Sequence, residues 1–434
     1  MPPREPCDVV EFQSTPVPGL TREEAGALEE LGRELRSTEL GVAAEDDSES
    51  DSEGSGDDRA SVISVTQRPS DQCWRVQVRN AIGVIGVDDL QINVLPKIGQ
   101  SHFNHVAAKA VDPPRLRFGR QAFRLEPDSW FLPAVWGAFL DATELTLRAD
   151  LHHEYEEHVD DPAYIRGRLD VRRVSLNLTR GILRFPAMFD ELTVDNPVNR
   201  VLRAAAEAVE VAAEVAAPKE AGAPRESYMR LVSRAREAVY RMGDVGKMRP
   251  TDLEAELPRL ASHQRHAVEL AKHILSGVGR SLTVGDVAVT CFLQPTPGLM
   301  EDGIREILAS GLGGGVSVTK GRRTAARLDF NPDLVVAVQT DTTGKPRATG
   351  DVKYRLRRAD WPRNILEQAV TFAQVFTARK AFFLDFSDGS SWKTEKETIH
   401  DVEYHHFTWP CSAAMSPEDA EGHVISELQS ALLG

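Results

Sequence analysis

Three charged side chains on two short apolar segments are the clearest chemical feature of the chain. Asp333 stands at the start of NPDLVVAV (331–338), and Asp351 and Lys353 lie in TGDVKYR (349–355). Side chains two residues apart on a strand point to the same face, so Asp351 and Lys353 would face the same way beside Asp333. Paired carboxylates are ligands for Mg²⁺, and a neighbouring lysine can stabilise charge on a phosphate or orient an attacking water. The pattern predicts metal-assisted hydrolysis of a phosphodiester bond.

Other groups could complete this site. The backbone carbonyl of Val352 could provide a third oxygen ligand to the metal. Glu301, with Glu306 as its alternative, lies on the helical segment LMEDGIREIL and could add an acidic ligand. A carboxylate near a helix N-terminus is, however, also favoured by the helix dipole alone. Gln368, on the helix expected after the second strand, could orient the water or contact the phosphate, or it could be an ordinary polar position.

The spacing of the two aspartates supports this interpretation. Their separation of 18 residues is that expected of paired strands in a PD-(D/E)xK nuclease core. The pattern alone is weak, because a surface aspartate and an unrelated Asp–Lys pair on a solvated strand would look the same. The preceding Pro332, the two apolar strands and the upstream helix with Glu301 favour the nuclease site.

The whole chain is predicted to have a mixed α+β fold in four parts. Residues 1–70 are expected to form a disordered acidic extension and 71–150 a small β-rich domain. Residues 151–280 are expected to form a central region with a helical bundle, and 281–434 an α/β nuclease domain. Strands are expected within 73–98 and at 284–293, 314–319, 324–330, 333–339, 348–355 and 380–386, and helices at 129–148, 196–217, 225–242, 259–277, 298–311, 361–379 and 416–433.

The acidic extension has two distinct segments. Residues 21–36 predict a short amphipathic helix in which Thr21 and Glu24 have the spacing of a capping box. EDDSESDSEGSGDD (45–58) offers no apolar surface to bury, so we expect a disordered tether. A partner-docking or DNA-mimicking arm is the alternative. Order is expected to begin near residue 72.

Net charge is distributed unevenly along the chain. The formal net charge is −15, but residues 1–70 carry 6 basic and 17 acidic side chains, which leaves 45 basic and 49 acidic ones for the remainder. A nearly neutral body is not built to bind DNA strongly by itself. This charge balance suggests a partner that supplies most of the affinity for DNA.

Cysteine usage and hydropathy indicate the compartment. The four cysteines are scattered without a CxxC pair, which argues against a structural zinc or a disulfide framework and favours a reducing cytoplasm. The N-terminus lacks the apolar core of a signal peptide. No 18-residue apolar run is present, so we expect a cytoplasmic protein that does not span a membrane.

Two further clusters of polar residues lie in the middle of the chain. HHEYEEH (152–158) holds three histidines, but without a CxxC or HExxH context it is better interpreted as a solvated acidic loop than as a metal site. Six arginines follow, and they could contact DNA phosphate or an acidic or nucleotide-bearing partner, or form a solvated basic face: Arg166, Arg168, Arg172, Arg173, Arg180 and Arg184.

The order of motifs resembles the McrC family, the nuclease subunit of the McrBC modification-dependent (5-methylcytosine) restriction system. LMEDGIREIL places Glu301 on the acidic position of the family, and NPDLV, DVKYR and EQAVTFA follow in the order of the family. Met300 replaces the usual Phe and Phe372 the usual Tyr, and both keep apolar bulk. Upstream segments that also resemble the family are IGVIGVDDLQINVLPKIG (82–99), Tyr155, IRGRLD (165–170), FDELTVDNPVNRVL (189–202) and RHAVELAKHIL (265–275).

The resemblance implies a partner and a division of labour. It implies an McrB-like AAA+ GTPase (or ATPase) hexameric ring that recognises modified double-stranded DNA, while this chain stimulates NTP hydrolysis and cuts the DNA with Mg²⁺. Residues 73–280 would then dock on the ring, with 151–280 as the central partner-docking region. Two alternatives remain, a non-cleaving regulatory adaptor of the ring and a stand-alone PD-(D/E)xK repair nuclease.

Overall fold

A computed structural model describes residues 4–35, 61–67, 73–111, 131–217, 223–253, 260–276, 278–325, 327–339, 345–357, 363–389, 394–399 and 401–433. The chain divides into two compact units. The first comprises residues 1–136, 211–229 and 276–434, and the second comprises 137–210 and 230–275. None of the helices in these described ranges is long and apolar enough to cross a bilayer.

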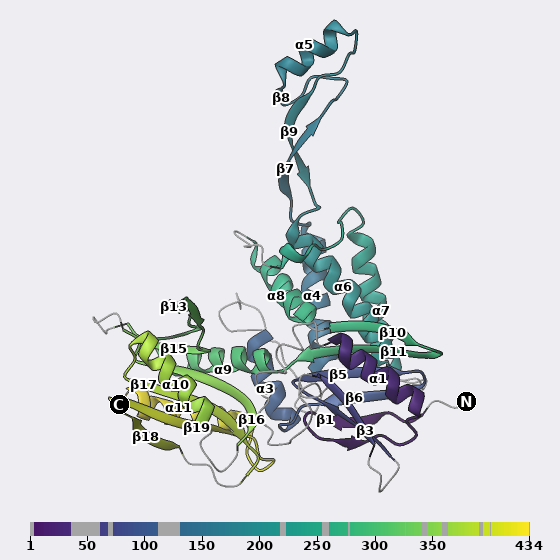
Figure 1. Cartoon of the computed structure of the whole chain (residues 1–434). Coiled ribbons are helices and arrows are strands. Elements are labelled where there is room, and N and C mark those ends of the chain that lie inside the picture. Colours follow the sequence, from purple (N-terminus) through teal and green to yellow (C-terminus); the bar gives the residue numbers. More distant parts are fainter. Residues whose placement is uncertain are drawn as a thin grey trace. The chain divides into compact units, whose positions relative to one another are not determined.

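A five-stranded sheet in the first unit joins segments from distant parts of the sequence (Figure 1). β1 runs parallel to β6, and the other neighbours are antiparallel. The predicted boundary at residue 281 falls inside this sheet, because β10 pairs with β11 and β11 pairs with β5. In order, the strands are β1 (Cys7–Val10), β6 (Leu90–Leu95), β5 (Ala81–Val87), β11 (Val287–Pro295) and β10 (Val278–Val284).

The segment before residue 70 is folded where it is described. Helix α1 (Arg22–Leu35) buries three leucines in the core of the five-stranded sheet, and its Thr21–Glu24 capping box is confirmed by hydrogen bonds of 2.8 and 3.2 Å. The expectation that order begins near residue 72 is wrong, because α1 and β1 bury apolar side chains that disorder would leave in water. The acidic run 45–58 lies outside the described residues. A small antiparallel sheet adjoins α1, with the order β2 (Thr15–Pro16), β4 (Trp74–Val78) and β3 (Ile63–Gln67).

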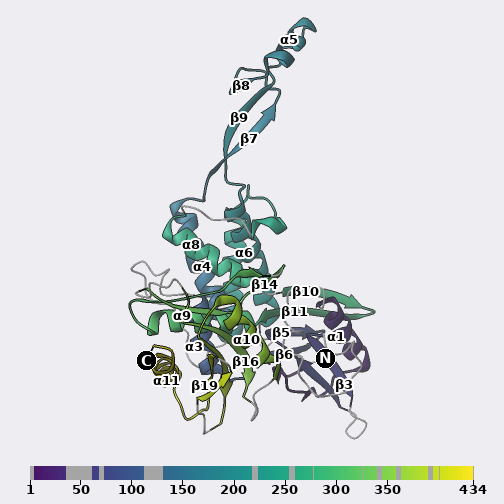
Figure 2. The same cartoon turned by 60° about the vertical axis from the view of Figure 1, so that its left-hand side comes forward.

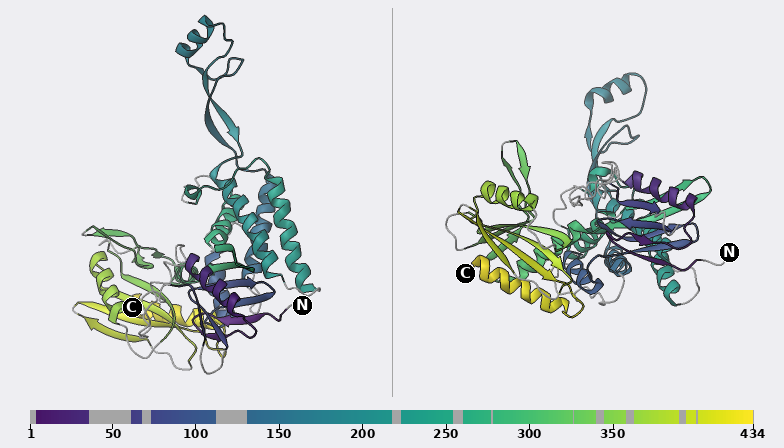
Figure 3. Two further views of the ribbon diagram at one scale, coloured as in Figure 1. Left: turned by 45° about the vertical axis from the view of Figure 1, so that its right-hand side comes forward. Right: turned by 60° about the horizontal axis from the view of Figure 1, so that its bottom comes forward.

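A six-stranded mixed sheet forms the C-terminal part of the same unit. Its three parallel strands are β16, β17 and β19, and the other pairings are antiparallel. The right panel of Figure 3 shows α10 (Arg363–Phe376) and α11 (Pro417–Leu428) on opposite faces of this sheet. The sequence predicted four of the six strands and missed β18 and β19. In order, the strands are β12 (Val316–Thr319), β15 (Leu334–Val338), β16 (Ala348–Leu356), β17 (Lys380–Ser387), β19 (Val402–Pro410) and β18 (Glu395–Ile399).

Three other elements pack around this sheet in the first unit. α3 (Gln100–Val111) contacts α9 (Pro297–Gly311), and α9 in turn packs on β16. The predicted strand 324–330 is instead a hairpin of β13 (Arg323–Ala325) and β14 (Leu328–Phe330). Gly303 allows the close approach of α3 and α9, because a Cβ there would lie 2.2 Å from the carbonyl oxygen of Val106.

The second unit combines helices with a long β-ribbon. It holds most of α4 (Phe131–Ala149), α6 (Pro197–Ala216), α7 (Ala223–Arg241) and α8 (Ser262–Ser276), which confirms the predicted helices. Figures 1 and 2 show the ribbon running away from these helices with α5 at its far end. We call this ribbon, residues 154–193, the arm. It consists of β7 (Glu154–Asp160), β8 (Arg168–Leu169), α5 (Val171–Thr179) and β9 (Ala187–Thr193).

Candidate functional site

The structure brings Asp333 and Asp351 together across two antiparallel strands. Leu334 on β15 pairs with Gly350 on β16, so the aspartates on either side of this pair stand next to each other. Both are buried, with 8% and 6% of their surface exposed. The backbone N–H of Val352 donates to Asp333 Oδ2 at 3.0 Å, which fixes one carboxylate against the neighbouring strand. The predicted carboxylate pair is therefore present in the fold.

Lys353 joins this pair as its position on the strand predicted. Its Nζ lies 2.8 Å from Asp351 Oδ2, and its side chain is mostly buried. The contact is an ion pair without good hydrogen-bond geometry, because Asp351 Oδ2 has no well-aligned donor among the described residues. A buried ammonium therefore stands beside two buried carboxylates, where low dielectric strengthens its field.

Helix α9 brings Glu301 to the same place. The charge of Glu301 is felt by Asp333, whose pKa it helps to raise, and Lys320 Nζ lies 3.7 Å from Glu301 Oε2. Arg305, one turn further along α9, donates to the backbone carbonyl of Asp333 at 3.2 Å. Glu306, the alternative acidic position, is buried on the same helix. Glu301 is thus the glutamate whose charge contributes to the raised pKa of Asp333.

Gln368 is less closely tied to the pair. It is half-buried on α10, which packs on β16 and β17, and it makes no side-chain hydrogen bond to another described residue. Within the described ranges, no three His, Cys, Asp or Glu side chains converge tightly enough to hold a metal ion by themselves. A bound ion would therefore need a backbone oxygen or water in addition to carboxylates, which is the usual ligand set of Mg²⁺.

Burial and mutual repulsion make the two carboxylates poor acids. Burial, together with the charge of Glu301, raises the pKa of Asp333 to about 6. Burial and the charge of Asp333 raise the pKa of Asp351 to about 7, while Lys353 opposes the rise. Strongly raised pKa values at a cluster of charged groups are typical of functional sites.

Comparison with protein families assigns the chain. The model described as "McrBC 5-methylcytosine restriction system component" matches residues 76–377, which include both aspartates, Lys353 and Gln368. The chain belongs to this McrBC family. No curated protein sequence matches it.

Two solved structures resemble the chain. One is a chain of the refined half-complex from the tetradecameric assembly of Thermococcus gammatolerans McrB AAA+ hexamers with bound McrC. It has 16% identity and a TM-score of 0.53, and the match covers 98% of this chain and 100% of that one. The other comes from the cryo-EM structure of the Thermococcus gammatolerans McrBC complex, with 18% identity, a TM-score of 0.43 and coverage of 71% and 88%. The first match supports a shared fold.

The residues of this McrBC chain fit a divalent cation. Asp351 Oδ2 is buried without a well-aligned donor, and two carboxylates with raised pKa values face each other. A cation between them would bind the buried oxygen and offset the repulsion between the two carboxylates, because it carries the opposite charge. Oxygen donors suit hard ions such as Mg²⁺ better than soft ones.

The raised pKa values predict a pH-dependent stability of the metal-free protein. A carboxylate with a raised folded-state pKa stabilises the fold fully below its unfolded pKa, and this contribution is lost as pH rises through the folded-state value, here about 6 to 7. Metal-free wild type should therefore lose about 2–4 °C in Tm between pH 5.5 and pH 8 relative to Asp351→Asn. Calorimetry of both proteins in EDTA checks this, and equal slopes would contradict the buried, coupled pair.

Gly350, next to Asp351, is required by close packing of β16 on β17. A Cβ at this position would lie 2.2 Å from the ring of Phe382, which is fully buried. Gly350→Ala should destabilise the protein by about 1–3 kcal/mol through overpacking and displace Asp351. Gly314→Ala is the matched control, because nothing lies within 4 Å of its added methyl group. Chemical denaturation of both variants checks the prediction, and an unchanged midpoint for Gly350→Ala would refute it.

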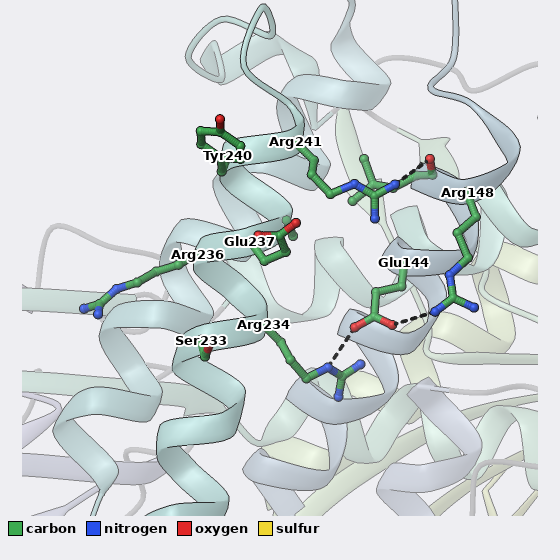
Figure 4. Close-up of a pocket in the computed structure, with 10 residues that line it drawn as sticks. Glu144, Arg148, Ser233, Arg234, Arg236, Glu237, Tyr240 and Arg241 are labelled. Carbon is green, nitrogen blue, oxygen red and sulfur yellow. Dashed lines mark hydrogen bonds and ion pairs between the residues drawn. The ribbon is translucent and has the colours of Figure 1, made fainter.

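A separate pocket in the second unit is a poor candidate for chemistry. It lies between α4 and α7, and Figure 4 shows Arg148 and Arg234 directed at Glu144 and Arg241 directed at a backbone oxygen. Arg234 bonds Glu144 at 2.9 Å, and Arg241 donates to the carbonyl of Leu147 at 3.0 Å. These charges link the two helices, so we interpret the pocket as part of the packing of the unit.

Sequence reasoning missed a buried polar network on the neighbouring strands. His406 Nε2 on β19 lies 2.8 Å from Asp385 Oδ2 on β17, and both side chains are fully buried. Thr408 joins Asp385 at 3.2 Å and accepts from Arg357 at 2.8 Å. The strand that was missed is VEYHHFTWP (402–410). Its apolar and polar residues do not alternate, because polar side chains occupy buried positions, so the hydrophobic pattern does not predict a strand.

Proposed function

We propose that this chain is the Mg²⁺-dependent DNA endonuclease subunit of a McrBC-type modification-dependent restriction complex, active in defence against foreign DNA. The observation that carries the proposal is the buried group of Asp333, Asp351 and Lys353 inside a chain of the McrBC family. The six-stranded mixed sheet, with α9 and α10 beside the site, supports assignment of the C-terminal part to the PD-(D/E)xK class.

Each residue has a role in this proposal. Asp333 and Asp351 would hold the Mg²⁺, with Glu301 and the carbonyl of Val352 as further ligands. When bound, the ion supplies an activated water and neutralises charge on the phosphate. Lys353 stabilises the charge that develops on the scissile phosphate. Gln368 would orient the water or contact the phosphate from α10.

The proposed partner is an McrB-like AAA+ ring, a GTPase or an ATPase, that recognises the modified double-stranded DNA. The similar solved chain comes from an assembly described as McrB AAA+ hexamers with bound McrC, which supports a ring partner for this chain. The near-neutral body of residues 71–434 also supports a partner that supplies most of the DNA affinity. The arm of the second unit is the candidate contact with the ring.

Plasmid cleavage with its requirements varied one at a time tests the proposal. Methylated plasmid should be linearised when wild-type chain, the ring, NTP and Mg²⁺ are all present. EDTA should reduce cleavage by at least about 100-fold because it removes the metal ion. Omission of the ring should have an effect of the same size, because the ring supplies most of the affinity for DNA. Full cleavage without the ring would support a stand-alone nuclease instead. Stimulated NTP hydrolysis without any cleavage would support a regulatory adaptor.

A further inference from the structure

A fully buried glutamate near the N-terminus connects two elements of the candidate site. Glu11 follows β1 and has none of its surface exposed. Its Oε1 accepts from the hydroxyl of Thr296 at 2.7 Å, and its Oε2 accepts from the hydroxyl of Tyr354 at 2.9 Å. The backbone N–H of Lys97 donates to Oε2 at 3.2 Å. One carboxylate thus takes three hydrogen bonds from three distant segments.

The cation of this cluster is Lys97, from the PKI stretch of the N-terminal strands. Its Nζ lies over the rings of Phe12 and Tyr354, at 4.0 and 4.1 Å from their centres. Lys97 is half-buried and its charge acts on Glu11, so loss of this ammonium would leave a fully buried carboxylate without its cation.

The two hydroxyl groups that bond Glu11 belong to residues of the elements that carry the site. Thr296 is the N-cap of α9; its side chain accepts from no backbone N–H of the helix, and its hydroxyl donates to Glu11. Tyr354 follows Lys353 directly on β16 and points to the opposite face of the sheet. Glu11 therefore anchors both the helix that bears Glu301 and the strand that bears Asp351.

We propose that Glu11 is a positioning residue for DNA cleavage, which fixes α9 and β16 relative to each other and so sets the distance between Glu301 and the Asp351–Lys353 pair. This inference rests on the proposed nuclease function. The family match begins at residue 76, so Glu11 lies outside it, while Lys97, Thr296 and Tyr354 lie inside it. The N-terminal segment would accordingly help to position the residues of the candidate site.

The test compares Glu11→Gln with a matched control in the full chain with its ring. Glu11→Gln keeps the shape but removes the charge that faces Lys97. Glu24→Gln is the control, since Glu24 is equally buried in the same part of the protein and bonds Arg4 and Thr21 instead of site elements. Glu11→Gln should lower the cleavage rate and raise the Mg²⁺ concentration for half-maximal cleavage, each by about 10–100-fold, as loss of outer-shell support does. Stimulation of NTP hydrolysis by the ring should stay unchanged.

A second readout separates this inference from the proposed function. Hydrogen exchange of the amides in β16 and in the first turns of α9 should accelerate in Glu11→Gln and stay at the wild-type rate in Glu24→Gln. Unchanged exchange at these amides overturns the inference whether or not the protein cuts DNA. So does a wild-type Mg²⁺ dependence of Glu11→Gln, or an equal effect of Glu24→Gln at equal loss of Tm. Absence of cleavage by wild type, with accelerated exchange in Glu11→Gln, overturns the nuclease function and leaves the anchoring role.

Discussion

Asp351→Asn is expected to reduce DNA cleavage by at least about 100-fold while the chain still stimulates NTP hydrolysis by its ring. The substitution keeps the shape of a side chain with 6% of its surface exposed but removes a negative charge that pairs with Lys353 and that the proposed Mg²⁺ would require. The fold should survive, because the neutral amide relieves the repulsion from Asp333 that raises the pKa of Asp351. Cleavage of methylated plasmid and NTP hydrolysis are measured on the same preparation.

Asp385→Asn provides the matched control for this prediction. Asp385 is a fully buried aspartate on the adjacent strand β17, where it pairs with His406. Its replacement should lower the stability of the sheet without a comparable loss of cleavage per folded molecule. If Asp351→Asn cuts methylated plasmid as well as wild type, the assignment of the metal site to this aspartate is wrong.

The core of the candidate site could be predicted because it depends on short-range pattern. Two apolar runs, a period of two residues and an 18-residue separation place Asp333, Asp351 and Lys353 on paired strands, and the structure has them there. The helix with Glu301 was equally clear from its apolar period. Such signals are local, so a single sequence contains them.

The features that could not be predicted from the sequence depend on long-range contacts. The pairing of β1 with β6 joins residues more than 80 positions apart, and the acidic composition of residues 1–70 suggested a disordered extension, although the helix predicted within it buries one face. Glu11 looked like one more acid in an acidic extension, and only the fold brings Thr296 and Tyr354 to it. β19 was missed because it buries His405, His406 and Thr408, which a hydrophobic pattern does not predict.

The six arginines of the arm fall into two groups in the structure. Arg173 pairs with Asp161 at 3.0 Å, Arg184 donates to the carbonyl of Asp161 at 3.1 Å, and Arg166 stacks on the ring of Phe189. These three hold the arm together. The other three are exposed and make no side-chain hydrogen bond or ion pair with any residue that the structure describes: Arg168, Arg172 and Arg180.

The arm also exposes apolar surface that a free protein would normally bury. Helix α5 has no buried residue, and large apolar side chains near it are exposed, among them Val171 at 71% and Leu183 at 72%. Exposed apolar groups mark protein interaction sites, and arginine is one of the residues that contribute most to binding energy, so the combination is typical of a protein-binding surface. The three unpaired arginines and this apolar surface together form the proposed contact with the ring.

Arg172→Glu combined with Arg180→Glu should therefore reduce stimulation of the NTPase of the ring by at least about 10-fold, because each change replaces an unpaired cation at the contact with an anion. The loss of ring contact should reduce cleavage in parallel, while Mg²⁺ binding at the aspartate pair stays at the wild-type level.

Arg173→Ala is the matched control: it lies on α5 next to Arg172 but pairs within the arm, so it should loosen the arm without reversing charge at the contact. NTP hydrolysis is measured against chain concentration, with Mg²⁺ binding by calorimetry on the same variants. Wild-type stimulation by the double variant would place the ring contact elsewhere, and a smaller loss than that of Arg173→Ala would assign the arm a purely structural part.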